Sequence, residues 1–383
     1  MSSEVLLDIR NLTKTFDVKA SAFSNKKLKL KAVDNVSLKI RAGETLGLVG
    51  ESGCGKTTLG RCLLKLYDVD DGRVFLRPDP ETRDAVLALD AERRLVEEQA
   101  AALEPGRAAK AERKKLQRRI SALKAEADSL AAETDILSME PATLKKNRRH
   151  LQMIFQDPWA SLNPRMLVKD IISEGPREFG LLPPSEMDNM VSRLLDQAGL
   201  PQAAASRYPH EFSGGQRQRI GIARALALNP SLIVCDEPVS ALDVSIQAQV
   251  LNLLIELQDE YNLTYVFIAH DLSVVQYISD RVTVMYLGRV AEQAPGRKLY
   301  ETPRHPYTVS LLGSVPVADP DKPLAGTILE GDVPSPVNPP SGCTFHPRCP
   351  RAADICSQKI PLLEEMADDH MAACHNPEPV TQG

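Results

Sequence analysis

The stretch that decides the fold runs from Thr45 to Thr57 and reads TLGLVGESGCGKT. Its second part, from Gly50 onward, fits the pattern G-x-x-x-x-G-K-T of a phosphate-binding loop. The five residues before that loop are apolar enough to form a buried parallel strand. After the loop, apolar side chains recur at helical spacing, namely Leu59, Cys62, Leu63 and Leu66. Strand, loop and helix thus follow in the order that the motif requires, which a chance glycine-rich turn would not give.

A phosphate-binding loop predicts an ATP site with defined roles for its side chains. Its glycines let the backbone N–H groups turn inward around an anion, and the positive end of the following helix adds to the attraction. Lys56 is expected to reach the β- and γ-phosphates, and the Thr57 hydroxyl to hold Mg²⁺. The nucleotide-binding residues expected in this segment are Gly50, Ser52, Gly53, Cys54, Gly55, Lys56, Thr57 and Thr58.

Two further apolar runs end in side chains that can act on the phosphates. Residues 232–238 predict a buried strand that delivers Asp236 and Glu237 at its C-terminal end, where open parallel sheets bind ligands. Asp236 is expected to hold Mg²⁺, and Glu237 to orient or deprotonate the attacking water. Burying two adjacent acids for structural reasons alone would be costly. Residues 264–269 predict another strand of the sheet, so His270 can approach the γ-phosphate.

A second anion site is predicted within the mostly helical stretch that ends near residue 228. Ser213 is a natural N-cap for a helix over residues 216–227. A serine followed by Gly214 and Gly215 at a helix N-terminus leaves backbone N–H groups free to bind an anion. The motif is weak alone and gains weight from the motifs around it.

The first forty residues predict two antiparallel strands, over 6–16 and 33–40. Phe16 ends the first strand, and it allows two interpretations of equal weight. It is either an ordinary core residue or a platform that stacks on a nucleotide base.

Residues 78–134 interrupt this pattern with a segment rich in Ala, Glu, Lys and Arg. A heptad seam and a break at 104–106 predict an antiparallel pair of helices, an α-helical hairpin inserted into the surrounding domain. Six acids lie in residues 84–104, and eight bases lie in residues 107–124, where Glu112 is the single acid. The arms are therefore complementary in charge, and a solvated, self-paired hairpin is favoured over a docking arm for a partner or for lipid headgroups. The seam residues of the second arm are Leu116, Ile120, Leu123, Ala127, Leu130, Thr134 and Leu137.

Composition places the chain among ordinary globular proteins. Its 383 residues are enough for one large domain with additions or for two domains, and 25% of them are charged and 43% apolar. A net charge of −5 gives no overall sign of nucleic-acid binding, so no nucleic-acid partner is expected. We see no signal peptide and no apolar run long enough to span a membrane, which predicts a cytosolic location. The three cysteines outside the tail, Cys54, Cys62 and Cys235, are expected to be core residues.

The order of these motifs resembles the nucleotide-binding cassette of ABC transporters. The resemblance covers residues 5–290 and implies an α/β fold: a P-loop NTPase, RecA-like core with an antiparallel β subdomain and a helical signature subdomain. The resemblance implies that Glu237, His270, Lys56 and Gln156 are catalytic residues. It also implies that Gln156 binds Mg²⁺ together with Thr57 and Asp236, and that Phe16 stacks on the adenine. The signature begins with Phe212, where Leu is commoner. The ATP-binding residues implied beyond the phosphate-binding loop are Ser213, Gly214, Gly215, Gln216 and Asp243.

The chain looks most similar to the F-type ATPase subunit of oligopeptide and dipeptide importers. The runs 156–165, 236–249 and 305–308 carry that likeness. It implies ATP hydrolysis coupled to peptide import, a second D-type ATPase subunit, two transmembrane permeases and an extracytoplasmic peptide-binding protein. Ser213 and Gly215 would contact ATP held by the second cassette. The location implied is peripheral, on the cytoplasmic face of the inner membrane.

Two alternatives stay open beside peptide import. A DNA-acting ATPase of the SMC and Rad50 kind also inserts a coiled coil into such a cassette, although the hairpin here is short and has no metal-hook cysteine pair. An importer ATPase for another solute, such as nickel, is the other alternative.

The C-terminal region, residues 291–383, changes character again. Seven prolines between residues 316 and 340 predict an extended strap instead of regular structure. Four cysteines within forty-one residues suggest a metal, and the residues alone leave an iron–sulfur cluster, zinc and unliganded thiols open. His346 and His375 are possible ligands only for zinc. The resemblance to peptide-importer ATPases implies a [4Fe–4S] cluster on Cys343, Cys349, Cys356 and Cys374.

Overall fold

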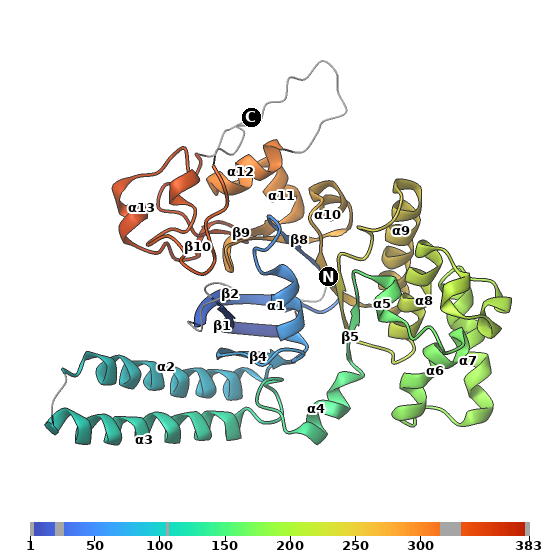
Figure 1. Cartoon of the computed structure of the whole chain (residues 1–383), viewed down its shortest axis with the longest axis horizontal. Helices are drawn as coiled ribbons and strands as arrows, with labels where there is room; N and C mark the ends of the chain where they lie inside the picture. The colour runs from blue at the N-terminus through green and yellow to red at the C-terminus, as the bar shows by residue number, and fades with distance from the viewer. Residues whose placement is uncertain (1–3, 20–26, 105–106, 315–330, 380–383) are drawn as a thin grey trace, which may run out of the picture.

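The structure is a computed structural model that describes residues 4–19, 27–104, 107–314 and 331–379. Within these residues the strands form a mixed sheet in the order β10-β11-β9-β8-β3-β7-β6-β5 and an antiparallel sheet in the order β2-β1-β4 (Figure 1). The strands are β1 Val5–Lys19, β2 Lys27–Arg41, β3 Thr45–Val49, β4 Asp71–Leu76, β5 Leu151–Ile154, β6 Leu232–Asp236, β7 Thr264–Ile268, β8 Arg281–Tyr286, β9 Arg289–Pro295, β10 Glu364–Ala367 and β11 His370–Ala372.

The α-helices are α1 Lys56–Leu63, α2 Pro80–Ala102, α3 Arg107–Leu130, α4 Pro141–Arg148, α5 Pro158–Ser161, α6 Val168–Glu178, α7 Pro184–Gln197, α8 Gly214–Leu226, α9 Val244–Tyr261, α10 Leu272–Ile278, α11 Gly296–Glu301, α12 Pro306–Gly313 and α13 Asp354–Gln358. Short 3₁₀ turns lie at Gln202–Ser206, Pro209–Glu211 and His346–Arg348.

The centre of the mixed sheet is the parallel set β8-β3-β7-β6-β5. All five residues of β3, β6 and β7 are buried, as expected of parallel strands covered on both faces. The strand predicted over 45–49 is confirmed, and those predicted over 232–238 and 264–269 are confirmed with the shorter bounds Leu232–Asp236 and Thr264–Ile268. The helix after the phosphate-binding loop ends at Leu63, so Leu66, which the helical spacing had included, lies beyond it and is exposed.

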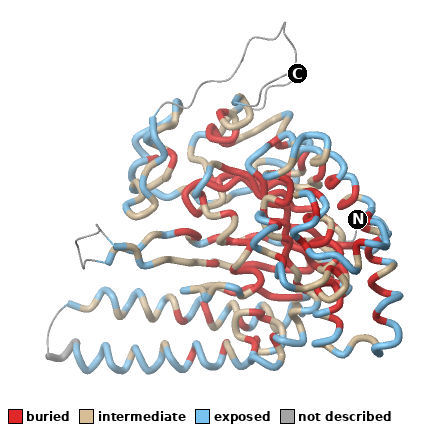
Figure 2. The backbone as a smooth tube through the Cα atoms, turned by 45° about the vertical axis from the view of Figure 1, so that its right-hand side comes forward, coloured by how far each residue is buried: buried red, intermediate tan, exposed pale blue. Residues whose placement is uncertain are grey.

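Two further layers complete the cassette (Figure 1). The antiparallel pair β1 and β2 is confirmed, and β4 joins β1 on its other edge. On the opposite side, α5 to α8 pack into a helical layer, and α8 begins at its expected Ser213 cap. Figure 2 shows the buried segments gathered in the mixed sheet and the helices that cover it, while the outer arms of the hairpin are mostly exposed.

The hairpin forms as α2 and α3, and its base packs on β4. Val86, Ala127 and Ala131 form a small apolar cluster with Phe75 of β4. Leu123 is also buried, but Leu130, predicted in the seam, is 46% exposed. Residues 105–106 of the expected break lie outside the described residues.

The predicted pairing of charges between the two arms is largely wrong. Among the described residues, the arms share one ion pair, Arg119 with Glu92. Many bases of α3 instead point away from α2, because only the seam side of a helix can meet its neighbour. The acids of α2 turn partly to the core, where Asp90 meets Arg73.

Arg73 of β4 fastens the hairpin to the core. Its guanidinium donates to Asp90 at 2.8 and 3.1 Å, Asp128 at 2.6 Å and Asp135 at 3.2 Å, as well as to the Ser138 hydroxyl at 2.8 Å. These partners come from α2, α3 and the segment that returns to the core. Ile136 then donates its backbone N–H to the Val74 carbonyl, which restores the path of the chain beside β4.

Replacing Arg73 with alanine should strongly destabilise the protein. Asp135 would lose its cationic partner inside the core, and Asp90 would keep only Arg93, whose guanidinium lies 3.5 Å away. Breaking buried ion pairs in this way costs about 3–5 kcal/mol. The free energy of unfolding of the purified chain in urea measures the effect. Arg119→Ala is the matched control, since its pair with Glu92 is exposed and contributes less than about 1 kcal/mol. Equal losses in the two variants would contradict the anchoring role of Arg73.

The C-terminal region continues the mixed sheet instead of standing apart. β11 pairs antiparallel with β9, and the expected boundary at 290/291 falls inside β9. The buried carboxylate of Glu292 accepts the backbone N–H groups of Arg304 and His305 at 2.6 and 2.9 Å and lies 2.6 Å from His370 of β11. This one side chain therefore joins β9, the start of α12 and β11.

The predicted proline strap is described only in part. Pro316, Pro320 and Pro323 lie outside the described residues. From residue 331 to 345 the chain holds no helix or strand, and the Pro336 carbonyl accepts a hydrogen bond from Lys31 of β2.

The buried histidine His305 should make the protein less stable in acid. Burial lowers its pKa to about 4 from 6.5, and Glu292 opposes that change. The unfolded chain then binds a proton that the folded chain does not, so stability falls as the pH drops from about 6.5 to about 4. The loss reaches about 2 kcal/mol near pH 5.

Denaturation curves of the wild type and His305→Asn at several pH values measure this effect. Asparagine keeps an acceptor for the Tyr307 N–H, which now bonds to His305 at 3.0 Å, but it does not titrate. His210→Asn, at an exposed position, serves as the control. A variant with the same acid sensitivity as the wild type would rule out His305 as its source.

Candidate functional site

The phosphate-binding loop is closed around the ammonium group of Lys56. That group donates to the carbonyl oxygens of Gly50 at 2.7 Å and Glu51 at 3.1 Å, and the residue is 5% exposed. Ser52 and Gly53 are exposed at the tip of the loop, and Thr58 is half-buried on α1. The predicted residues of this segment therefore form a single loop at the start of α1, with its basic side chain held inside it.

Two glycines of the loop cannot be replaced without moving the backbone. Gly55 has φ +104°, and a Cβ there would lie 2.0 Å from the Ala32 carbonyl oxygen. Gly50 has φ +145°, and its Cβ would lie 2.2 Å from the Met285 carbonyl oxygen. The loop thus fits tightly between β2 and the end of β8.

Thr57 and Asp236 meet across the sheet. The Thr57 hydroxyl donates to Asp236 Oδ1 at 2.7 Å, and the guanidinium of Arg61 lies 3.7 Å from Oδ2. Burial raises the pKa of the Asp236 carboxyl, and the hydrogen bond from Thr57 partly opposes the rise. Oδ2 is buried without a hydrogen-bond partner. These residues fit a magnesium nucleotide, because Mg²⁺ binds to one or two protein oxygens together with phosphates and water.

The predicted catalytic side chains converge on Glu237, directly after β6. The amide of Gln156 donates to Glu237 Oε2 at 2.8 Å, and His270 Nδ1 lies 3.4 Å from the same oxygen. Glu237 has φ +46°, a strained left-handed conformation for a glutamate, while its backbone N–H stays bonded to Ile268 of β7. Its side chain is 18% exposed and lines a groove of about 520 Å³ with Gln156, Gly214 and His270.

The signature and the neighbouring loop are built as helix caps. Ser213 accepts a hydrogen bond from the Gln216 N–H, and the Gln216 side chain accepts one from the Ser213 N–H. Gly215 packs against Ile246, where a Cβ would lie 2.4 Å from a methyl group. Asp243 caps α9 by accepting the Ile246 N–H at 3.0 Å. Both helix starts thus expose ordered backbone N–H groups beside the groove.

Phe16 lies in β1, the middle strand of the antiparallel sheet, opposite Leu30 of β2. It is half-buried, contacts the ring of Tyr67 edge-on at 5.5 Å, and has the ammonium of Lys14 4.9 Å from its ring centre. Stacking of Phe16 on a nucleotide base stays a prediction.

Three residues that matter for the phosphate-binding loop were missed from the sequence. The backbone N–H of Glu51 donates to the Tyr307 hydroxyl at 2.9 Å, and Arg348 donates to the Glu51 carboxylate at 2.8 and 3.1 Å. The side chain of Arg348 is only 6% exposed. The C-terminal region therefore holds the second residue of the loop. No local pattern could reveal a contact between residues so far apart in the chain.

Family models match both parts of the chain. The ABC transporter model matches residues 33–144 and 120–240, two ranges that overlap at the end of the hairpin. The model for the oligopeptide/dipeptide transporter C-terminal region matches residues 291–356. The oligopeptide transport ATP-binding protein AppF of Bacillus subtilis is 44% identical over 98% of both chains. A probable peptide ABC transporter ATP-binding protein of Sinorhizobium fredii is 44% identical over 97% of this chain and 90% of its own.

This chain belongs to the ATP-binding subunits of oligopeptide ABC transporters. The putative oligopeptide transport ATP-binding protein YkfD of Bacillus subtilis, 46% identical over 97% of this chain, agrees with that assignment. The expected resemblance is thereby confirmed, and so is the assignment as an ABC-type ATPase. The DNA-acting alternative is not favoured.

Solved ABC cassettes share the fold. The dimeric ATP-binding cassette MJ0796 in a post-hydrolysis state aligns over 76% of this chain and 99% of its own, with a TM-score of 0.55 and 23% identity. CbiO1 of Clostridium perfringens aligns over 78% of this chain with a TM-score of 0.51. The likeness confirms the predicted α/β cassette with its helical and antiparallel parts.

The four cysteines of this ABC subunit's tail lie near one another but do not form a metal site. Burial raises the pKa of the Cys374 thiol to about 11, and the other three cysteines add to the rise. In the part of the chain that the structure describes, no group of three or more His, Cys, Asp or Glu side chains is arranged to hold a metal ion. The [4Fe–4S] expectation is therefore not supported, nor is zinc.

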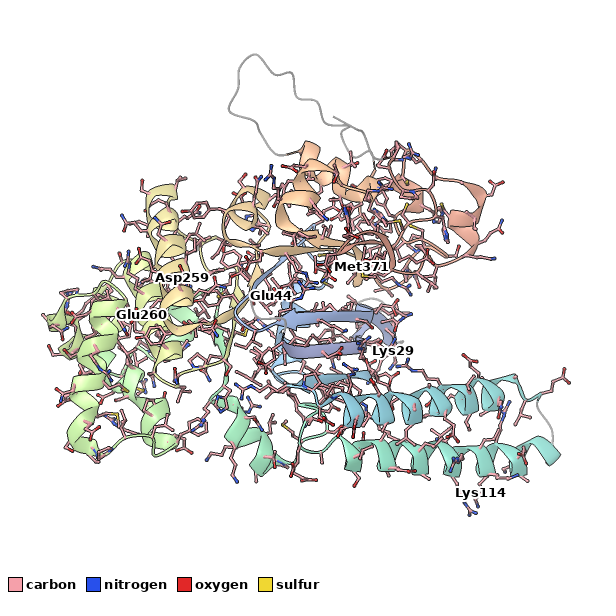
Figure 3. All side chains as sticks on the ribbon, turned by 180° about the vertical axis from the view of Figure 1, so that it is seen from behind. Lys29, Glu44, Lys114, Asp259, Glu260 and Met371 are labelled. Atoms are coloured by element: carbon pink, nitrogen blue, oxygen red, sulfur yellow. The ribbon has the colours of Figure 1, made fainter. Side chains whose placement is uncertain are left out.

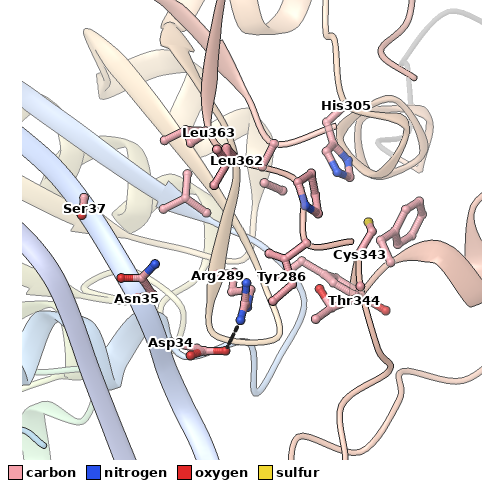
Figure 4. A pocket seen from close by; sticks show the side chains of 17 residues that line it. Asp34, Asn35, Ser37, Tyr286, Arg289, His305, Cys343, Thr344, Leu362 and Leu363 are labelled. Carbon is pink, nitrogen blue, oxygen red and sulfur yellow. Dashed lines mark hydrogen bonds and ion pairs between the residues drawn. The ribbon is translucent and has the colours of Figure 1, made fainter. Parts of the chain in front are cut away.

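The surroundings of these cysteines show how the tail is held instead. Cys343 donates its backbone N–H to the Cys356 carbonyl at 2.7 Å. His346 and His375 contact the carbonyl oxygens of Cys343 and Lys359. Cys343 also lines a cavity of about 360 Å³ between the tail and β9, beside the ion pair of Arg289 with Asp34 (Figure 4). Cys54, Cys62 and Cys235 are buried core residues, as predicted.

Removing Arg348 should weaken nucleotide binding. Glu51 would lose its charged partner, and the loop would be held less firmly, so we expect an ATP affinity about tenfold lower for Arg348→Ala. Equilibrium titration of the purified chain with a fluorescent ATP analogue measures this. Arg351→Ala removes a nearby ion pair with Glu378 and should leave the affinity unchanged.

A double-mutant cycle with Glu51→Ala tests whether the effect comes from this contact. If it does, the double variant should bind ATP about as well as either single variant. Effects that multiply would mean that Arg348 acts through another route.

Proposed function

We propose that this chain binds ATP with Mg²⁺ and hydrolyses it to drive the import of peptides through a multi-subunit transporter. The observation that carries the proposal is the meeting of Gln156, Glu237 and His270 beside the Thr57–Asp236 pair. The relatives are named as peptide and oligopeptide transport proteins, which supplies the substrate class. Residues 1–290 act as the cassette, and residues 291–383 as the C-terminal region.

Each side chain has a role that its position allows. Lys56 leaves its carbonyl partners to bind the β- and γ-phosphates, and Thr57 and Asp236 hold Mg²⁺, which neutralises phosphate charge. Glu237 accepts a hydrogen bond from the attacking water and orients it toward the γ-phosphate. Gln156 and His270 fix the carboxylate of Glu237, and His270 is exposed enough to reach the phosphate.

Hydrolysis requires a second cassette. Ser213 and Gly215 lie on the helical layer, so the phosphate that their N–H groups bind belongs to ATP on the partner's loop. Asp243 lies at the same exposed edge. We assign the second cassette to a D-type ATPase subunit rather than to another copy of this chain. The dimer of the solved cassette MJ0796 supports a paired arrangement.

A groove beside the site suits the permeases. It has a volume of about 900 Å³ and lies between β5, α6 and the end of α4. Its floor is apolar, with Met153, Phe155 and Leu228, and its rim is charged, with Arg148 and Glu174. Phe155 directly precedes Gln156, which contacts Glu237, so a permease helix in this groove would be linked to the catalytic carboxylate.

The proposed function implies a peripheral location on the cytoplasmic face of the inner membrane. Among the described residues, no helix is both long and apolar enough to cross a bilayer. Two permeases supply the membrane path, and an extracytoplasmic binding protein delivers the peptide.

Glu237→Gln should keep ATP binding and lower the rate of hydrolysis at least about 100-fold, because the amide cannot accept the proton of water. Lys56→Ala should weaken binding itself. ATP affinity and phosphate release are measured on the assembled transporter, with the equivalent glutamate of the partner cassette also replaced. Glu133→Gln, at an exposed position of the hairpin end, is the control. Hydrolysis at the wild-type rate in Glu237→Gln would overturn the role of this residue.

A further inference from the structure

The outer face of α3 carries a row of bases that form no ion pair with any of the described side chains. Lys110, Lys114 and Arg118 are exposed and lie four residues apart, which puts them on one side of the helix. The opposite side faces α2 through Leu123 and Ala127. Figure 3 labels Lys114, whose side chain points away from the molecule.

Neighbouring groups do not neutralise this row. Arg119 is bound to Glu92, and Arg113 to the Leu103 carbonyl. Within the described residues, Lys110, Lys114 and Arg118 have no ion pair, and Glu112, the one acid between residues 107 and 124, lies 3.7 Å from Lys115. Like charges one turn apart repel and weaken a helix. The hairpin keeps this arrangement although acids lie close by on α2.

The hairpin holds its basic face in a fixed direction. The buried contacts of Arg73 with Asp90 and Asp128 tie both helices to β4. In Figure 1, α3 lies along the same lower side of the molecule as α4 and α6, which border the groove assigned to the permease. The basic face therefore points toward the bilayer that surrounds the permease.

We propose that this face, Lys110, Lys114 and Arg118 on α3, binds the anionic headgroups of the cytoplasmic leaflet. The orientation rests on the proposed function, since the permease groove defines the side of the membrane. The row spans about 12 Å of helix, and each base near an anionic bilayer adds attraction that salt screens. This contact with lipid holds the cassette beside its permease, and the hairpin itself needs no protein partner.

Vesicle co-sedimentation of the purified full chain tests the proposal. The wild type should bind vesicles of phosphatidylcholine mixed with phosphatidylglycerol, should not bind pure phosphatidylcholine, and should be released by high salt. The triple variant Lys110→Gln, Lys114→Gln, Arg118→Gln should bind the anionic vesicles at least about tenfold more weakly. Lys110→Arg with Lys114→Arg preserves the charges and should bind as the wild type does.

A control variant removes the same charge elsewhere. Lys29→Gln, Arg297→Gln, Lys359→Gln changes three exposed bases on β2, α11 and the tail and should keep binding. Equal loss in both triple variants, or tight binding by the α3 variant, would overturn the proposal. The proposal would also be overturned if the wild type bound a DNA duplex more tightly than anionic vesicles and the α3 variant lost this binding to DNA. ATP affinity is measured in parallel and should be the same in the wild type and in both triple variants. A wild-type chain that binds no ATP would instead count against the proposed function.

Discussion

The 2.7 Å hydrogen bond between Thr57 and Asp236 depends on the register of three parallel strands. Thr57 follows β3, Asp236 ends β6, and β7 lies between them, with Ile268 opposite both Leu48 and Asp236. A slip of one residue in either pairing would turn the carboxylate to the other face of the sheet. The register of these buried apolar strands thus sets the distance between the phosphate-binding loop and the two acids that follow one another at the end of β6. Glu237, one residue further, has φ +46°, and its backbone N–H is bonded to the carbonyl of the same Ile268.

The sequence was sufficient wherever the deciding residues are close together in the chain. The phosphate-binding loop, the strand that ends in Asp236, and the Ser213 cap each carry their own local signal, and each lies where it was predicted. Resemblance then supplied what spacing alone could not, the joint role of Gln156, Glu237 and His270. Their contact with one another is a property of the folded sheet.

The failures arose where the outcome depends on the folded surroundings of a side chain and not on its spacing in the sequence. Opposite charges on α2 and α3 suggested pairing between the arms, yet Asp90 is drawn to Arg73 on β4. Spacing placed Leu130 in the hairpin seam, but the helix ends there and Ala131 is buried instead. Counting cysteines suggested a metal cluster, and neither their spacing nor their number determines whether four sulfurs take up a ligand geometry.

The contacts of Arg348 and Tyr307 with Glu51 of the phosphate-binding loop have a consequence during synthesis of the chain. Glu51 and its partner Arg348 are 297 residues apart, so the ribosome makes the loop roughly 15–60 s before the residue that holds it. Tyr307, the other partner, also arrives late. A nascent or truncated cassette therefore displays the loop without its full support. The nucleotide site matures last, when the chain has been completed, and a prematurely ended subunit would be a poor competitor for cellular ATP.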